Sequence, residues 1–396
     1  MTSLHAPTTV AEPISSPQPS PRVMIACSGL GRIRRGNETW AQNVAEGLAR
    51  AGTQVTLAGG GPVPSVQCRY RQFANVPRES VITRRWLPWH RRYLFEQLGL
   101  TASLLMHRVW REIDILHVAD PDMALQLHRR AKGKGLRVVY KDGLSLGPTF
   151  CSRFDYVQVL APYYLEVGQA RGVDTKGWAV IPHLVNTERF APASDQAKVR
   201  MSLQVPGVTP DSCVVLAVGD FSPSSNKRLD WIVREFSMLP VPHRFHLFLA
   251  GHASGPESLQ FEREARALVR DRLHLFRNLG PDQMVSLYQA ADLFAHAALK
   301  EPFGIVFLEA MASGLPLVGH NFPATEWIIG EGGGTIDMAK PGGLAATLEL
   351  WGREERLRRA LGEAARNRAT KIFAEERIIP LYQRMYGQIM LERHSS

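Results

Sequence analysis

Short apolar segments alternate with helical patterns along most of this chain. Residues 23–28 form an apolar run that ends in a glycine-containing turn, residues 37–50 place apolar side chains on one helical face, and residues 55–58 form the next apolar run. Parallel strands need a crossover of this kind, so the unit predicts a parallel sheet covered by helices. Further strands of this first sheet are expected at residues 113–118, 136–140, 156–160 and 178–181.

A second series of strands and helices follows a stretch broken by prolines and glycine, residues 191–211, where we expect a domain boundary. Its strands are expected at residues 214–218, 245–250, 273–276 and 293–296, with helices at 229–238, 259–269 and 282–291. The 396 residues are enough for two domains with ordinary cores. The sequence therefore predicts the α/β class, with an N-terminal domain over residues 21–190 and a C-terminal domain over residues 191–375.

Composition narrows the class of protein further. Residues 1–20 are rich in Ser, Thr and Pro and lack the apolar core of a secretory signal, so a disordered tail is expected there. No run approaches 18 apolar residues, which argues against a membrane-spanning helix. The four cysteines are scattered, which indicates neither a zinc site nor a disulfide framework and favours a reducing compartment. A net charge of +10 favours anionic partners: nucleic acid, sugar nucleotides or acidic lipid.

Residues 301–319 predict a loop, a buried helix and a short buried strand. The free amides of Gly304 and Ile305 at the helix start suit a phosphate. Glu309, about one turn into the helix, could accept hydrogen bonds from ribose hydroxyls, and Glu301 would face the group beyond the phosphates. An alternative interpretation is equally consistent with the two carboxylates: one stabilises the helix dipole, and the other is unrelated to it.

The whole stretch resembles the E-x7-E signature of the family 4 retaining glycosyltransferases, of the glycosyl transferases group 1 type. The resemblance includes the E-P-F-G opening at Glu301 and the E-A-M-A-S-G-L-P run at Glu309. It implies the GT-B fold, in which two Rossmann-like domains face a cleft and a last helix, here residues 376–396, crosses back to the first domain. It also implies that Glu301 contacts the donor sugar, that the amides near Gly304 and Ile305 hold the pyrophosphate, and that Glu309 holds the ribose.

Further donor contacts are expected elsewhere in the C-terminal domain. Lys227 and Arg228 stand just before a predicted helix, where two cations are unfavourable unless an anion offsets them. Lys227 matches the family's pyrophosphate-binding lysine. Asp220 stands where the family has an arginine, and Arg228 would supply the positive charge that is missing there. Gly251 matches a glycine near the nucleotide base. Solvated surface charge is the alternative interpretation of the two cations.

The N-terminal domain matches the family less closely. Gly31 and Gly36 belong to a turn in which backbone amides can approach a phosphate, and residues 36–39 resemble the family's Gly-Gly-x-Glu-Thr turn beside the donor phosphates and the acceptor. Asp142 stands where relatives often have a histidine, so it could bind a sugar hydroxyl or take the acceptor's proton. An aspartate that stabilises a turn before glycine is an equal alternative.

The sequence predicts no metal site. Asp120 and Asp122 have the spacing of a metal-binding D-x-D pair, but Pro121 and Asp122 indicate the start of a helix instead. The resemblance agrees, because the GT-B family generally needs no metal in its fold. The nucleotide sugar would then be a co-substrate, and no cofactor is expected.

Residues 84–95 combine four arginines and two tryptophans without an acid. This composition fits a surface that lies on an anionic membrane. It also fits single-stranded nucleic acid, although no recognised nucleic-acid motif is present and that partner is not expected. An ordinary loop and helix with extended arginines is the third interpretation. We expect a cytoplasmic protein, with peripheral contact at the inner membrane face as the open alternative.

These observations predict a hexosyltransferase of the EC 2.4 type. It would move a hexose from a nucleotide diphosphate sugar to a hydroxyl of a polysaccharide, a lipid-linked acceptor or a small-molecule glycoside, and the resemblance implies retention of the anomeric configuration. The alternatives are another GT-B enzyme, such as a phosphorylase or a sugar-nucleotide epimerase, and a degenerate binding or scaffold module. The departures at Asp220, Asp142 and Phe322-Pro323 motivate the last of these.

Overall fold

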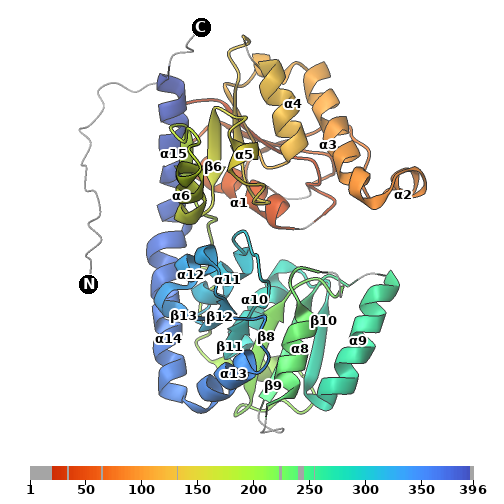
Figure 1. Cartoon of the computed structure of the whole chain (residues 1–396), viewed down its shortest axis with the longest axis vertical. Helices are drawn as coiled ribbons and strands as arrows, with labels where there is room; N and C mark the ends of the chain where they lie inside the picture. The colour runs from red at the N-terminus through yellow and green to blue at the C-terminus, as the bar shows by residue number, and fades with distance from the viewer. Residues whose placement is uncertain are drawn as a thin grey trace.

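The computed structural model describes residues 20–33, 35–63, 66–131, 133–222, 225–239, 245–253 and 255–392. It consists of two α/β units, each built on one parallel sheet, and a column of C-terminal helices runs along both (Figure 1). The tail predicted over residues 1–20 lies outside the described residues, apart from its last residue. Among the described helices, none combines the length and the apolar composition that crossing a bilayer requires.

The first sheet has seven strands in the order β3-β2-β1-β4-β5-β6-β7, and all neighbouring strands run parallel. The strands are β1 (Val23–Cys27), β2 (Val55–Gly59), β3 (Arg69–Gln72), β4 (Ile115–Val118), β5 (Arg137–Lys141), β6 (Tyr156–Val159) and β7 (Trp178–Val180). The helices are α1 (Gly36–Arg50), α2 (Val81–Trp86), α3 (Trp89–Met106), α4 (Pro121–Ala131), α5 (Pro148–Cys151) and α6 (Pro162–Ala170). The predicted parallel sheet is confirmed.

The second sheet has six strands in the order β10-β9-β8-β11-β12-β13, again all parallel. The strands are β8 (Cys213–Val218), β9 (Phe245–Gly251), β10 (Leu273–Arg277), β11 (Leu293–Ala295), β12 (Leu317–His320) and β13 (Gly333–Ile336). The helices are α7 (Gln196–Ser202), α8 (Leu229–Ser237), α9 (Gly255–Val269), α10 (Pro281–Ala290), α11 (Ile305–Ala312), α12 (Pro323–Ile329), α13 (Gly343–Arg353), α14 (Glu355–Arg368) and α15 (Glu375–Leu391). The domain limits proposed from the sequence stay predictions.

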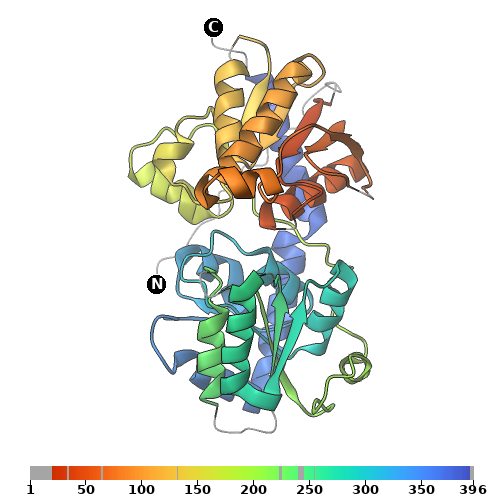
Figure 2. The same ribbon diagram turned by 90° about the vertical axis from the view of Figure 1, so that its right-hand side faces the viewer.

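Helices cover both faces of each sheet, which explains why the central strands are continuous apolar runs in the sequence. All five residues of β1 are buried, and successive side chains point to opposite faces. Val23 and Ile25 join a core with α1 and α15, whereas Met24 and Ala26 join a separate core with α3 and α4. The turned view shows α3 and α4 on the side of the first unit that faces the viewer, with α15 behind (Figure 2).

The last helix packs on the first sheet although it follows the second sheet in sequence. The Tyr382 hydroxyl accepts hydrogen bonds from Trp40 Nε1 and Gln158 Nε2, each at 2.8 Å. Its neighbour Tyr386 bonds through its hydroxyl to His117 Nδ1, also at 2.8 Å. A π-helical turn, Ala369–Phe373, separates α14 from α15. The chain therefore connects the two units twice, once between β7 and β8 and once through these helices.

Candidate active site

A buried carboxylate lies between two basic side chains at the carboxyl ends of β8 and β11. Glu301 follows β11, is 5% exposed, and its Oε2 accepts hydrogen bonds from Lys227 Nζ and from His296 Nε2, the latter at 3.0 Å. Lys227 comes from the loop after β8, and His296 comes directly after β11. Because β8 and β11 are hydrogen-bonded neighbours in the sheet, their two loops meet at the same edge.

The surroundings keep Glu301 ionised. Burial by itself would raise the pKa of Glu301, but the charge of Lys227 and the hydrogen bonds from Lys227 and His296 lower it to about 2. Burial lowers the pKa of His296, so at neutral pH this ring is uncharged. An ionised carboxylate can only accept hydrogen bonds. His296 Nε2 therefore carries the ring proton and donates the hydrogen bond to Glu301. Glu301 is thus a fixed acceptor, and Lys227, whose side chain is 28% exposed, keeps donors for a further group.

Helix α11 starts immediately after this carboxylate. Gly304 is its N-cap and has the left-handed backbone angle φ 78°, which favours glycine. A Cβ at Gly304 would come within 2.8 Å of the Phe307 ring and 3.1 Å of Glu301 Cγ. The predicted helix is confirmed with the bounds Ile305–Ala312. The first amides of a helix have no partner within it, and the dipole of α11 makes this end attractive to an anion.

Glu309 lies in the second turn of α11. Its Oε2 accepts a hydrogen bond from the Tyr288 hydroxyl of α10 at 2.7 Å. Burial raises the pKa of Glu309 to about 7, although the Tyr288 hydrogen bond and the charge of Arg189 act in the opposite direction. Glu301 and Glu309 are therefore two carboxylates of one loop and helix whose pKa values are driven apart by their surroundings.

Two other residues predicted for the donor side have local partners. Arg228 adopts the left-handed angle φ 52°, and its guanidinium stacks on the Trp231 ring at 5.0 Å and lies 3.9 Å from Asp230. At Gly251 a Cβ would collide with the carbonyl oxygen of Gly219, so the absence of a side chain lets β9 approach the end of β8. Packing thus explains Gly251, and the ligand roles of Arg228 and Gly251 stay predictions.

The first domain contributes a buried lysine beside the predicted aspartate. Lys141 is fully buried at the end of β5, donates from Nζ to Asn37 Oδ1 at 2.9 Å, and lies over the Trp40 ring at 4.8 Å. Burial lowers its pKa to about 8. Asp142 is also buried, and its Oδ1 accepts from the Leu146 amide at 3.1 Å. The structure therefore gives Asp142 a turn-stabilising contact, and a catalytic role for it stays a prediction.

The glycines of the first loop have different surroundings. Gly31 has φ 82°, and a Cβ there would lie 2.5 Å from the carbonyl carbon of Gly61, so the residue allows two loops to pack closely. Gly36 is the first residue of α1, and a Cβ there would meet open space. Packing explains Gly31 without a ligand, whereas Gly36 lies at an accessible helix start.

Side chains of the first domain reach the loop that carries Glu301. The Tyr164 hydroxyl of α6 donates to the carbonyl of Pro302 at 2.7 Å. The buried ring of His183 packs edge-on against Phe303 at 5.1 Å. Burial and the charge of Lys141 lower the pKa of His183, whereas Glu301 acts to raise it, so this ring lies within electrostatic reach of both. The two domains therefore meet at the Glu301 loop.

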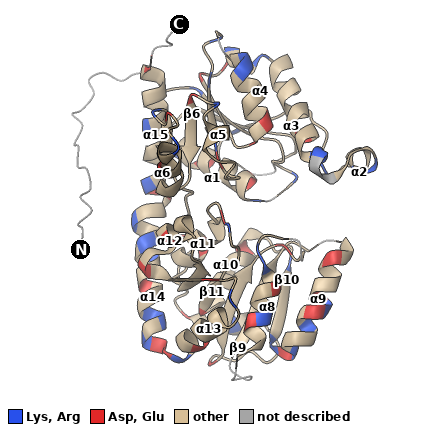
Figure 3. Cartoon of the chain, in the orientation of Figure 1, with Lys and Arg blue, Asp and Glu red and all other residues tan. Residues whose placement is uncertain are grey.

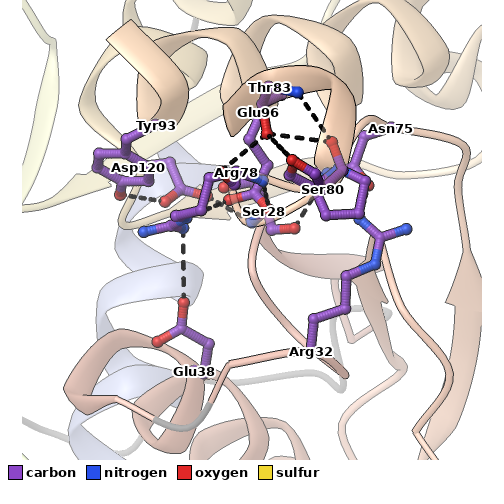
Figure 4. Close-up of polar contacts among 11 residues, drawn as sticks. Ser28, Arg32, Glu38, Asn75, Arg78, Ser80, Thr83, Tyr93, Glu96 and Asp120 are labelled. Carbon is purple, nitrogen blue, oxygen red and sulfur yellow. Dashed lines mark hydrogen bonds and ion pairs between the residues drawn. The ribbon is translucent and has the colours of Figure 1, made fainter. Parts of the chain in front are cut away.

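A buried polar cluster lies beyond β1 and β4 in the first domain (Figure 4). Asp120 accepts from the Ser28 amide at 2.6 Å and from the Tyr93 hydroxyl at 2.5 Å, while α4 begins at Pro121 as predicted. The Arg78 guanidinium lies 4.1 Å from the centre of the Tyr93 ring, and its Nη2 is 4.0 Å from Glu38 Oε1. Burial, then the charge of Asp120, raises the pKa of Glu38.

Sequence reasoning brought Lys227, Glu301 and Glu309 to one edge of the sheet but missed several of their partners. Tyr288 belongs to an ordinary helical pattern, so it carried no recognisable signal. Lys141 ends the buried strand β5 and His296 follows β11 directly, and a polar residue at the end of a buried strand was the signal that could have selected both. Only the packing of the two domains places His183 against Phe303 in the loop that carries Glu301.

Comparison with known proteins shows what the second half of the chain resembles. Residues 203–368 match the family model described as glycosyl transferases group 1. Over about 200 residues the chain is 32% identical to a D-inositol 3-phosphate glycosyltransferase from Acidothermus cellulolyticus and 28% identical to an N-acetyl-alpha-D-glucosaminyl L-malate synthase from Bacillus anthracis. The alignments cover 47% and 46% of this chain, and the chain spans only 44% and 48% of the two relatives.

Solved structures resemble the whole fold. A sucrose-phosphate synthase from Thermosynechococcus elongatus superposes with a TM-score of 0.78 at 19% identity, over 93% of this chain and 98% of that one. The Anabaena protein HepE in complex with UDP-glucose superposes with a TM-score of 0.73 at 16% identity, over 93% of this chain and 99% of that one. Residues 203–368 therefore resemble the glycosyl transferases of group 1, and the two facing α/β units form the GT-B fold.

Proposed function

We propose that this protein transfers a hexose from a nucleoside diphosphate sugar to an acceptor hydroxyl, with retention of the anomeric configuration. The observation that carries the proposal is the arrangement of Lys227 and Glu301 at the amino end of α11. A cation, a fixed carboxylate and free helix amides are the groups that a sugar diphosphate needs within one short segment. The similarity to a D-inositol 3-phosphate glycosyltransferase and to an N-acetyl-alpha-D-glucosaminyl L-malate synthase supports the reaction class.

The diphosphate would bind between Lys227 and the amides of Gly304 and Ile305. The ammonium of Lys227 has three donors, so it can hold Glu301 and a phosphate oxygen together. Negative charge builds on the leaving diphosphate as its bond to the sugar breaks, and a preformed cation and helix dipole stabilise that charge. Arg228 and Gly251 are secondary candidates for donor contact, and no metal or cofactor is part of the proposal.

Glu301 would position the sugar and Glu309 would hold the ribose. Glu301 is held by Lys227 and His296, which suits a hydrogen-bond acceptor for sugar hydroxyls rather than an attacking nucleophile. The bond between sugar C1 and the diphosphate oxygen would break while the acceptor oxygen bonds to C1 from the same face. The acceptor's proton would then pass to the leaving diphosphate, so no second carboxylate nucleophile is needed.

The test is a thermal-shift titration with UDP, GDP and ADP. A nucleotide at about 100 times its dissociation constant stabilises a folded protein by about 2.7 kcal/mol. We expect one nucleotide to stabilise the wild type, with a smaller effect in Lys227→Met. The matched control is Glu363→Gln, which removes an exposed carboxylate from α14 and should respond as the wild type does. The stabilising nucleotide then selects the sugar donors for an assay of turnover, with the anomeric configuration of the product read by NMR.

The competing functions give different outcomes. Glu301→Gln should keep nucleotide binding and lose most turnover, and near-normal turnover would remove Glu301 from the mechanism. Turnover that requires inorganic phosphate would identify a phosphorylase, and interconversion of the donor without an acceptor would identify an epimerase. A chain stabilised by none of the nucleotides would be a binding module without the proposed donor site.

A further inference from the structure

Helix α2 exposes apolar side chains on its outward face. Val81, Ile82 and Trp86 are 81%, 64% and 74% exposed, whereas Thr83 is 1% exposed. At 3.6 residues per turn, Val81, Ile82, Arg85 and Trp86 fall on one side of this helix, and Thr83 falls away from them. This short helix therefore turns its polar threonine inward and its largest apolar groups outward, the reverse of an ordinary surface helix.

Helix α3 continues the pattern over four turns. Leu94, Phe95, Leu98 and Met106 are exposed and follow one helical stripe, while Leu100 and Leu104 on the other side are buried in the core. Both helices lie on the side of the molecule that faces the viewer in the turned view (Figure 2). We name the outward groups the α2–α3 surface: Val81, Ile82, Arg85, Trp86, Arg91, Leu94, Phe95, Leu98 and Met106.

The charge of the α2–α3 surface is positive. Arg85 and Arg91 are exposed, and neither forms an ion pair with any described residue. By contrast, Arg84 pairs with Glu79 at 2.9 Å, and Arg92 donates to the carbonyl of Leu87 at 3.1 Å. The charge-coloured view shows basic residues on α2 and near the start of α3 (Figure 3). Two unpaired guanidinium groups thus lie among exposed apolar side chains.

A buried polar network fixes the two helices from behind (Figure 4). Thr83 Oγ1 donates within its own turn, and its amide donates to Ser80 Oγ at 3.2 Å. Arg78, just before α2, bonds through Nε to Glu96 of α3 at 2.5 Å, and Glu96 is fully buried. Breaking a buried pair of this kind is costly, so the helices do not rotate to hide their apolar face. The exposure of these apolar side chains is therefore fixed by the packing of the two helices.

We propose that the α2–α3 surface docks on an anionic lipid bilayer. Helices that lie in the bilayer interface place apolar and aromatic side chains among the acyl chains and arginines among the anionic headgroups, as this surface would. Trp86 and Phe95 supply aromatic groups, and Arg85 and Arg91 supply the charge complementary to the headgroups. The proposal goes beyond the transfer reaction and does not depend on it.

Two other occupants fit less well. A second copy of the chain that used the same surface about a two-fold axis would bring Arg85 and Arg91 close to their own copies, with like charges opposed. Single-stranded nucleic acid stacks its bases on aromatic groups, whereas most exposed apolar side chains here are aliphatic, such as Val81, Ile82 and Leu98. The mixture of aliphatic groups and unpaired arginines favours lipid.

The test is co-sedimentation of the full chain with vesicles of phosphatidylcholine alone or mixed with phosphatidylglycerol. We expect binding to the anionic vesicles that weakens as salt is raised. Each arginine near an anionic surface contributes about 1 kcal/mol, about fivefold in affinity, so Arg85→Ala combined with Arg91→Ala should weaken binding about 25-fold. Ile82→Ser combined with Trp86→Ala should reduce binding to the level of neutral vesicles.

Matched controls come from the second domain. Leu259 and Leu350 are comparably exposed apolar residues, and Arg263 and Arg356 are exposed arginines. Alanine at either pair should leave vesicle binding unchanged, and circular dichroism would check that every variant is folded.

Several outcomes would overturn the proposal. These are no binding to anionic vesicles, equal binding to neutral vesicles, or α2–α3 variants that bind as the wild type does. A dimer seen by light scattering that Ile82→Ser with Trp86→Ala abolishes would assign the surface to a second copy. Binding of single-stranded RNA lost in the arginine variant, without vesicle binding, would assign it to nucleic acid. Whether or not the protein binds vesicles, the outcome of the nucleotide titration is unchanged. The membrane proposal and the transferase proposal can therefore be refuted independently.

Discussion

The raised pKa of Glu309 makes the stability of the ligand-free protein depend on pH in a way that one substitution should remove. Glu309 is half-buried on α11, and burial raises its pKa from the usual 4.5 to about 7. In Glu309→Gln the side chain keeps its shape, and its amide oxygen still accepts the hydrogen bond from the Tyr288 hydroxyl. The variant therefore removes the titration and leaves the contact.

The magnitude follows from the difference between the two pKa values. Below about pH 4.5 Glu309 is protonated in both the folded and the unfolded chain, so its charge costs nothing. Between pH 4.5 and 7 the unfolded chain loses the proton first, and above about pH 7 the folded protein must also hold a buried charge. A pKa raised from 4.5 to about 7 corresponds to a loss of up to about 3 kcal/mol of folding free energy at high pH.

The assay is a set of thermal melts of the wild type and Glu309→Gln between pH 4.5 and 8. A domain of this size shifts its melting temperature by about 2 °C for each kcal/mol, so the variant should gain about 6 °C on the wild type as pH rises through this window. Glu363→Gln corrects for the loss of one surface carboxylate. A difference between variant and wild type that stays constant from pH 4.5 to 8 would refute the raised pKa and the buried charge behind it.

Three further predictions concern a ligand-binding lysine, a left-handed glycine and a buried ion pair. Lys227→Met should weaken nucleotide binding about tenfold to 100-fold, since a hydrogen bond to a charged group contributes about 1.5–3 kcal/mol, and calorimetry showing less than about a twofold loss would contradict it. Gly304→Ala should cost about 1–2 kcal/mol in urea denaturation because the residue is left-handed, and an unchanged midpoint would count against this. Arg200→Met should cost about 3–5 kcal/mol, because Arg200 is buried and pairs with Asp292 at 2.7 Å; a urea midpoint close to wild type would show that this buried pair can be dispensed with.

Much of the fold was predictable because the core elements carry strong periodic signals. The helix predicted within residues 301–319 is α11, and the predicted strands agree with the buried strands of both sheets within a few residues. The edge strands β3 and β13 were missed, because one is polar and the other begins with glycines. An edge strand is stabilised by one neighbour and faces solvent on its other side, so its sequence need not be apolar.

The candidate site was only half predictable. Glu301, Glu309 and Lys227 lie in short segments with recognisable patterns, and the structure places Lys227 against Glu301. Arg228, by contrast, stacks on Trp231, and Asp142 bonds to the amide of its own loop. A sequence pattern indicates that a side chain is near a site but cannot give its rotamer, which depends on contacts made by residues distant in the chain.

The sequence by itself determined the two parallel sheets, the approximate boundaries of their buried elements and the sheet edge at which the candidate site lies. These follow from local periodicity and from turns, which act over a few residues. Only the tertiary structure decided which groups surround Glu301, how far the pKa values of Glu301 and Glu309 separate, and which face of α2 stays exposed. These properties depend on burial and on charges brought together from separate strands, and the energy of a charge is set by what surrounds it in space.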